Sequence, residues 1–248
     1  MSSDSLIELK GVWKKYNYRE TFHRSIREDI FNIFRRTRRE ELQDGEFWAL
    51  SDVNLRLSGG ECIGFYGPNG AGKSTILKLI ASVTYPTMGE VIIRGVVAPL
   101  IELGAGFHLD LTGRENIYIN GAIIGMTIRE IREKIDSIIE FSELSDFIDM
   151  PIKKYSSGMH LRLGFSIAVY SSAEIFLFDE ILTVGDEDFQ LKCLERARWL
   201  RNNGRAIIIV SHDKKLLNEM SGTIYHINKG IVSTEDVKAS GDTAHHNI

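Results

Sequence analysis

One stretch of the chain has the residue types and spacing needed to hold a run of phosphate groups. Its glycines let successive backbone N–H groups point at one anion, Lys73 can reach the terminal phosphates, and the Ser74 hydroxyl can ligate Mg²⁺. We therefore predict a nucleoside triphosphate site with Mg²⁺; the competing interpretation is a glycine-rich turn with a surface lysine. The stretch fits G-x-x-x-x-G-K-[ST] and reads Gly67-Pro68-Asn69-Gly70-Ala71-Gly72-Lys73-Ser74-Thr75.

Two flanking elements must position this stretch. Residues 62–66 are apolar and predict a buried strand, and residues 76–81 predict a helix whose N-terminal end faces the phosphates. A strand, a glycine-rich loop and a helix in this order are the context that the motif requires.

Two further apolar strands end in polar side chains that suit phosphoryl transfer. Residues 175–178 lead to Asp179 and Glu180, and residues 206–210 are followed closely by His212. Parallel strands present such ends at the sheet edge where ligands bind. We predict that Asp179 holds Mg²⁺ through water, that Glu180 is the general base, and that His212 orients the attacking water. Taken alone, either end is better explained by ordinary strand and loop residues, and it is the phosphate-binding motif upstream that favours the catalytic interpretation.

Hydrophobic periodicity predicts a mixed α/β protein around these residues. Thr127 and Glu130 are spaced as a helix capping box. Helices are predicted within residues 112–147 and over residues 159–171. The other predicted strands cover residues 6–12, 50–57, 89–95, 224–227 and 231–234, the last two forming a hairpin across residues 228–230.

Composition excludes several classes of protein. The 248 residues carry a formal net charge of −4, which gives no overall attraction to nucleic acid, and we expect no nucleic-acid partner. The two cysteines, Cys62 in a predicted strand and Cys193 in a predicted helix, form neither a disulfide framework nor a metal pattern. The sequence shows no secretion signal and no apolar run long enough to span a membrane.

Residues 19–45 separate two predicted strands that a short connection would normally join. Apolar residues fall near one helical face and precede a basic cluster of Arg35, Arg36, Arg38 and Arg39. Two interpretations stay open: a solvated surface helix, or a contact with anionic lipid headgroups or a membrane partner.

A second peptide gives the chain a family resemblance. Tyr155-Ser156-Ser157-Gly158-Met159-His160 precedes the carboxylate strand and resembles the signature peptide of ABC-transporter ATPases, whose usual form is Leu-Ser-Gly-Gly-Gln. Ser157 and Gly158 match its second and third positions. The resemblance implies that Ser156, Ser157, Gly158 and Met159 contact the ATP held by the other chain of a homodimer.

The resemblance covers Leu6 to about Thr234 and implies the fold. It is an α/β P-loop NTPase of the ABC ATPase type, with a mostly parallel sheet, an antiparallel β subdomain and a helical lobe. The expected domain covers residues 1–234, with the lobe at about 103–171, the inserted segment at about 19–45, and a polar tail at 235–248.

The resemblance also assigns roles to single residues. Tyr16 would stack on adenine, with Tyr18 and Trp48 as rival candidates. Asp186 matches an aspartate that contacts the other subunit. Glu102 stands where most members carry a glutamine that senses Mg²⁺, and a carboxylate can ligate that ion.

Three stretches depart from the usual family motifs: residues 100–108, residues 155–159 and Val184-Gly185-Asp186. These variants resemble one branch, the ATP-binding subunits of bacterial polysaccharide exporters of the O-antigen and teichoic-acid type. The branch implies a homodimer beneath two transmembrane permease subunits, on the cytoplasmic face of the inner membrane, with a lipid-linked polysaccharide as cargo. The sequence ends about where the ATPase domain ends, so we expect no carbohydrate-binding domain after it. Three alternatives stay open. The chain could serve an exporter of teichoic acid, capsule, lipid or drug, it could be a soluble ABC-type ATPase, or it could be a nucleotide-dependent regulator that scarcely hydrolyses ATP.

Overall fold

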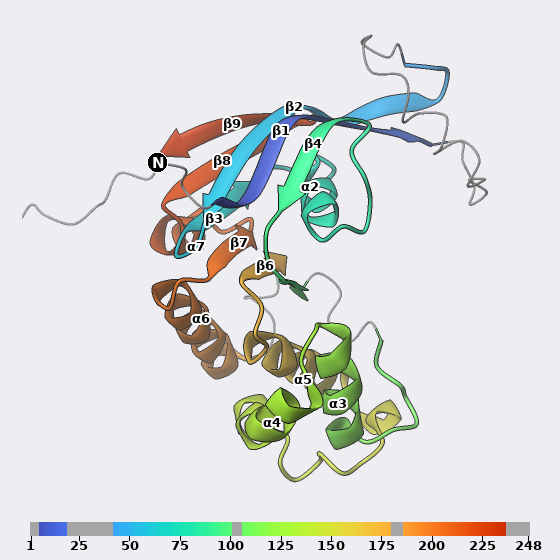
Figure 1. The fold of residues 1–248 in the computed structure, drawn as a ribbon, viewed down its shortest axis with the longest axis vertical. Coiled ribbons are helices and arrows are strands. Elements are labelled where there is room, and N and C mark those ends of the chain that lie inside the picture. Colours follow the sequence, from blue (N-terminus) through green and yellow to red (C-terminus); the bar gives the residue numbers. More distant parts are fainter. Residues whose placement is uncertain (1–4, 19–41, 101–105, 180–185, 237–248) are drawn as a thin grey trace, which may run out of the picture.

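The computed structural model describes residues 5–18, 42–100, 106–179 and 186–236, which form two β-sheets and a group of helices (Figure 1). The smaller sheet is antiparallel, with the order β2-β1-β4, and the larger has the order β5-β6-β7-β3-β8-β9. The strands of the smaller sheet are β1 (Ser5–Asn17), β2 (Glu46–Ser58) and β4 (Met88–Ile93). Those of the larger are β3 (Cys62–Tyr66), β5 (Val97–Pro99), β6 (Ile175–Asp179), β7 (Ala206–Val210), β8 (Thr223–Asn228) and β9 (Ile231–Asp236).

Figure 1 shows α3, α4 and α5 gathered below the sheets. Helix α2 packs in the core shared by the two sheets, and α6 and α7 pack on the larger sheet. Their bounds are α2 (Lys73–Ile80), α3 (Gly113–Ile123), α4 (Ile128–Ser142), α5 (Ser157–Val169), α6 (Glu187–Asn202) and α7 (Lys214–Met220), with a 3₁₀ turn η2 (Ile152–Lys154) before α5.

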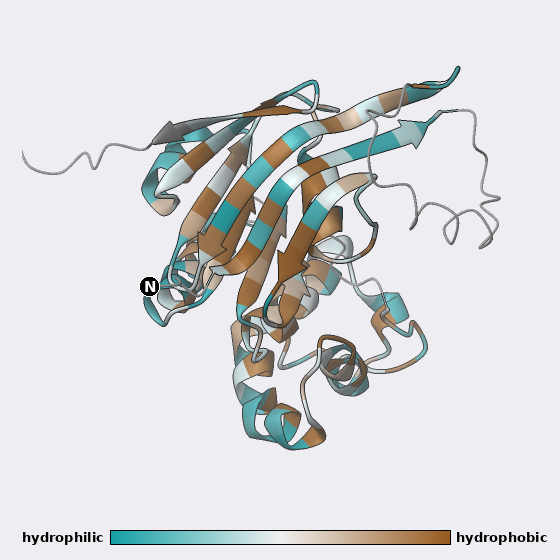
Figure 2. Ribbon diagram, turned by 45° about the horizontal axis from the view of Figure 1, so that its top comes forward, coloured by the Kyte–Doolittle hydropathy of each residue, from teal (hydrophilic) through white to brown (hydrophobic). Residues whose placement is uncertain are grey.

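The apolar strands β6 and β7 are central strands of the larger sheet. Their side chains point alternately into two different hydrophobic cores. Phe176, Phe178 and Ile207 face a core shared with α5, α6 and α7, whereas Leu177 and Ile208 face one shared with α2 and the smaller sheet. A third core holds α3, α4 and α5 together. The strands of the smaller sheet alternate hydrophobic and hydrophilic residues, as Figure 2 shows, because only one of its faces is buried.

A local sequence signal starts α4 as expected. The capping box at α4 is confirmed, because the Thr127 side chain accepts from the Glu130 N–H and the Glu130 side chain accepts from the Thr127 N–H. Thr112 and Glu115 form a second box at α3. Each box satisfies two backbone donors that the first helical turn leaves unpaired.

The terminal hairpin is confirmed and packs beside the phosphate loop. β8 and β9 pair antiparallel, and Lys229 and Gly230 in the turn have positive φ values of 47° and 78°. The Gly230 N–H donates to the Ala71 carbonyl at 2.9 Å, and the Gly230 carbonyl accepts from the Ser51 N–H at 2.8 Å. The turn therefore joins the phosphate loop to β2.

Element bounds differ from expectation mainly in the smaller sheet. β1 continues five residues beyond the predicted end, to Asn17, because it pairs with β2 as far as Glu46. The short strand β5 was not predicted, since its three residues carry no periodic signal. The arginine cluster at residues 35–39 lies outside the described residues, as does most of the predicted tail, and the domain limits stay predictions.

No helix among the described residues combines the length and the apolar character needed to cross a membrane.

Candidate nucleotide-binding site

Three parallel strands bring the predicted site residues to one edge of the larger sheet. β3 lies beside β7, and β7 beside β6, all parallel. Their carboxyl ends lead to the loop 67–75, to His212 and to Asp179 respectively. Segments more than a hundred residues apart in the sequence thus meet at the edge where α/β sheets bind ligands.

Lys73 is a buried cation at the start of α2. It is only 6% exposed, and its Nζ donates to the carbonyls of Gly67 at 2.7 Å and Pro68 at 3.0 Å. It forms no ion pair with any carboxylate in the described part of the chain. A buried ammonium normally requires a compensating anion, so this group fits a bound phosphate.

Gly72 allows the loop to pass close to β2. Its φ is 116°, and an added Cβ would lie 2.7 Å from the Ala49 carbonyl oxygen and 2.9 Å from Leu50 Cδ2. Only glycine adopts this conformation without strain and leaves this space.

We expect Gly72→Ala to lower the free energy of unfolding by about 2–4 kcal/mol, because left-handed backbone strain adds to overpacking. Gly70→Ala is the matched control, since Gly70 also has a positive φ, of 74°, but no atom lies within 4 Å of its added Cβ. Urea unfolding of both variants measures the difference. Equal losses would show that the contact with Ala49 contributes nothing.

A cavity of about 550 Å³ opens over the loop, within the size range of small-molecule sites. The loop and Asp179 line one part of it, and aromatic and small residues of β1 and β2 line the other. The lining residues are Tyr16, Phe47, Ala49, Asn69, Gly70, Gly72, Lys73, Ser74, Thr75 and Asp179.

Of the three aromatic candidates for adenine stacking, Tyr16 alone lines this cavity. Trp48 packs edge-on against Trp13, with ring centroids 5.2 Å apart, and Tyr18 is 70% exposed outside the cavity lining. The ring centroids of Phe47 and Tyr16 lie 6.3 Å apart. Phe47 was not predicted from the sequence to be a site residue. Strand alternation was the available signal, since Phe47 pairs with Tyr16 across the sheet.

If Tyr16 stacks on the base, Tyr16→Ala should weaken ATP binding by about 1–3 kcal/mol, roughly 5- to 150-fold. Tyr18→Ala is the matched control, because it removes the same side chain from outside the cavity. Titration of the purified chain with a fluorescent ATP analogue would measure both affinities. A larger loss of ATP affinity in Tyr18→Ala than in Tyr16→Ala would show that Tyr18 is the residue that stacks on adenine.

His212 is joined to the loop directly. Its Nε2 lies 3.1 Å from Asn69 Oδ1, so the end of β7 contacts the phosphate loop. With this oxygen as acceptor, Nε2 carries the proton. Ser74 and Asp179 both line the cavity and offer oxygen ligands, the type that Mg²⁺ prefers. Glu180 and Glu102 lie outside the described residues, so their predicted roles stay predictions.

The signature residues lie at the start of α5, away from the cavity lining. Ser156 caps the helix by accepting from the Met159 N–H at 3.2 Å, and Ser157 and Gly158 form its first turn. The helix begins two residues earlier than expected, because Ser156 supplies the cap. Asp186 likewise caps α6 and is exposed. One chain does not bring these residues to its own cavity, and their contact with a second copy stays a prediction.

Both cysteines are free and buried. Burial raises the pKa of the Cys62 thiol to about 11 and that of Cys193 to about 12, so both stay protonated at neutral pH.

The sequence was compared with known proteins and with protein families. The family model for the ABC transporter matches residues 50–183, more than half of the chain. The chain belongs to the ABC transporter family. The matched segment of the chain runs from β2 through the phosphate loop, α5 and β6.

Several members of the ABC transporter family resemble the chain over most of its length. It is 41% identical over 210 residues to the O-antigen export system ATP-binding protein RfbB of Klebsiella pneumoniae, covering 85% of each. It is 42% identical over 214 residues to RfbB of Myxococcus xanthus and spans about half (48%) of that protein's length. It is 38% identical over 245 residues to the teichoic acids export ATP-binding protein TagH of Enterococcus faecalis, covering 99% of this chain and 52% of that protein.

Solved structures confirm the ABC ATPase fold. The ATP-binding cassette MJ0796, in a dimeric post-hydrolysis state bound to ADP and Pi, has a TM-score of 0.73 at 21% identity, covering 94% of this chain and 99% of that one. A structure described as the ATP-binding subunit of an ABC transporter has a TM-score of 0.76 at 19% identity, covering 94% and 90%. The predicted fold class is therefore confirmed.

Proposed function

We propose that this ABC transporter family member is the ATP-hydrolysing subunit of an exporter that moves an O-antigen-like, lipid-linked polysaccharide across the inner membrane. The observation that carries the proposal is its 41% identity to the Klebsiella RfbB protein over 85% of both chains. The cavity over Lys73, with Ser74 and Asp179 beside it, supports the ATPase part independently.

The residues of this chain divide the chemistry among them. The loop 67–75 and Lys73 hold the phosphates through backbone N–H groups and one ammonium. Ser74 and Asp179 would hold Mg²⁺, which would supply positive charge to the phosphate oxygens. Glu180 takes a proton from the attacking water, and His212, fixed by Asn69, orients that water.

The exposed starts of α5 and α6 support a homodimeric assembly. In a homodimer, residues 156–159 of one copy cover the nucleotide held by the other, and Asp186 contacts the partner copy. ATP binding closes the pair, which drives two permease subunits, and hydrolysis reopens it. The chain would sit on the cytoplasmic face of the membrane through these permeases.

Teichoic acid is the second candidate cargo, because the similarity to the Enterococcus TagH protein covers 99% of this chain. The two cargoes differ in chemistry. A teichoic acid has a phosphate-rich backbone, whereas an O-antigen-like polymer consists mainly of sugars.

The test replaces the wild-type chain by Glu180→Gln in cells of the source organism and analyses lipid-linked polymers on the cytoplasmic side. A sugar-rich polymer accumulating inside, with loss from the surface, supports the proposal. A phosphate-rich polymer transfers the assignment to teichoic acid. Unchanged pools would reject polysaccharide export. Glu187→Gln, an exposed residue of α6, is the control for the substitution itself.

A further inference from the structure

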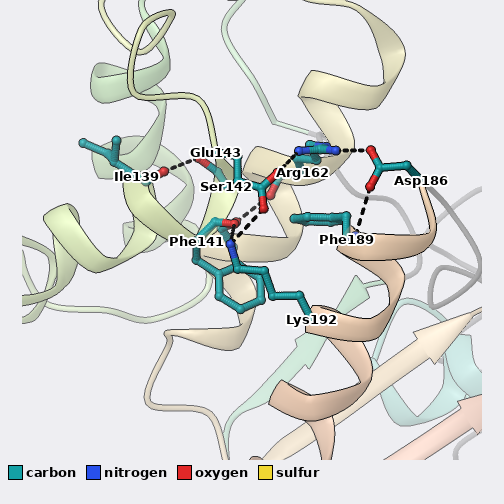
Figure 3. Close-up of polar contacts among 9 residues, drawn as sticks. Ile139, Phe141, Ser142, Glu143, Arg162, Asp186, Phe189 and Lys192 are labelled. Carbon is teal, nitrogen blue, oxygen red and sulfur yellow. Dashed lines mark hydrogen bonds and ion pairs between the residues drawn. The ribbon is translucent and has the colours of Figure 1, made fainter.

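A cluster of four charged side chains joins the helical group to α6, outside the cavity described above (Figure 3). At its centre Arg162 of α5 donates from Nη1 to Glu143 and from Nη2 to Asp186. One guanidinium therefore bridges two carboxylates from different elements. The planar fork of arginine suits this arrangement, which lysine cannot reproduce.

Further contacts fix the bridge in place. The guanidinium lies 4.7 Å from the ring centroid of Phe189, and the Phe189 N–H donates to the other oxygen of Asp186 at 3.0 Å. Lys192 donates to Glu143 at 3.1 Å and to the Phe141 carbonyl at 3.0 Å. The Arg162 side chain is only 19% exposed, so solvent does not compete freely for it.

Both carboxylates are ionised at neutral pH. Burial opposes ionisation of Glu143, but hydrogen bonds from Lys192 and Arg162 outweigh it and lower its pKa. The Phe189 N–H, and then Arg162, lower the pKa of Asp186. The cluster therefore holds two cations against two anions.

The bridge links the ends of two helices, α4 and α6, to α5. Glu143 caps the carboxyl end of α4, and Asp186 caps the amino end of α6. Arg162 stands on α5 between them, little more than one turn after Ser157 and Gly158 at the start of the same helix. A single side chain thus links the signature end of α5 to the residue predicted to touch the partner copy.

We propose that Arg162 is a positioning residue that fixes residues 156–158 relative to Asp186, so that both contacts with a second copy form together. The inference rests on the proposed function, in which these two segments meet the partner's nucleotide and the partner's chain. Because the Arg162 side chain is partly buried against Phe189, its removal is expected to lower the thermal midpoint as well as to weaken assembly.

The test measures ATP-driven dimerisation of the full chain with hydrolysis blocked by Glu180→Gln, using light scattering over a range of Mg·ATP concentrations. Adding Arg162→Gln should raise the ATP concentration for half-maximal dimer by about 10-fold or more. In the hydrolysis-competent chain the same change should lower kcat while the affinity of the isolated chain for ATP stays unchanged. The control is Arg114→Gln, which removes a similar fork to Asp149 (2.7 and 3.2 Å) within the helical group.

Two further variants separate positioning from folding. Arg162→Lys keeps the charge and the apolar stem but pairs with one carboxylate only, so it should restore the thermal midpoint without restoring dimerisation. Glu143→Gln should weaken dimerisation by itself and add nothing to Arg162→Gln, because both act through one bridge.

The failures are distinguishable. If Glu180→Gln dimerises with ATP and Arg162→Gln does not change this, Arg162 has no positioning role and the proposed function stands. If Glu180→Gln alone never dimerises with ATP, the proposed function fails and the inference fails with it.

Discussion

Lys73→Ala should abolish ATP hydrolysis by the purified chain and weaken ATP binding. The ammonium is buried, with only two backbone carbonyls as partners in the described structure, so its third donor is available to a phosphate. Hydrogen bonds to charged groups contribute about 1.5–3 kcal/mol, which corresponds to a loss of affinity of roughly 10- to 150-fold. Hydrolysis should fall further, by at least about 100-fold, because charge on the transferring phosphate grows in the transition state. Equilibrium binding and phosphate release measure the two effects.

Lys78→Ala is the matched control, since Lys78 lies on the same helix and outside the cavity lining. It should leave binding and hydrolysis unchanged. If Lys73→Ala hydrolysed ATP at the wild-type rate, the phosphate loop would not be part of the catalytic site. The Lys73 ammonium donates to the carbonyls of Gly67 and Pro68, so its removal can disturb the fold of the loop. The thermal midpoint of Lys73→Ala must therefore be measured as well, so that a misfolded loop is not mistaken for a lost phosphate contact.

Glu180→Gln should retain ATP binding and lose hydrolysis by about 10²- to 10⁴-fold, the usual contribution of a general base. The amide keeps the size of the side chain but cannot accept the proton of the attacking water. Asp179, the residue before it, already lines the cavity at the end of β6. Single-turnover hydrolysis and ATP affinity, measured on the same sample, test both halves of the expectation.

Glu187→Gln should behave as wild type, because this carboxylate lies in the exposed first turn of α6. If Glu180→Gln turned over normally, another group would have to serve as base. His212 would then be the first candidate, since it contacts Asn69 of the loop.

The sequence predicted the site best where local chemistry is decisive. The glycine spacing before Lys73 dictates a loop, and continuous apolar runs at β3, β6 and β7 dictate buried parallel strands. Thr127 and Glu130 likewise predicted a helix start from four residues alone. In each case the physical cause lies within a few positions of the chain.

Features that depend on distant pairing were not predictable in this way. Phe47 faces the cavity only because β2 pairs with β1 in a register that places it opposite Tyr16. Arg162 finds Glu143 and Asp186 nineteen and twenty-four positions away in sequence, which no periodicity reveals. The choice between Tyr16 and Trp48 also needed the register, since neighbouring strand residues point to opposite faces.

The turn between β8 and β9 has a practical consequence for anyone who wishes to label this protein. Hairpin turns are usual places to insert an epitope tag or a fluorophore-bearing peptide, because they are expected to tolerate extra residues. Here an added Cβ at Gly230 would lie 2.7 Å from the Ala49 carbonyl oxygen, and the Gly230 N–H already bonds to Ala71 of the phosphate loop. An insertion at this turn would disturb the phosphate loop and β2, so a reporter belongs elsewhere, for example on the exposed face of α4.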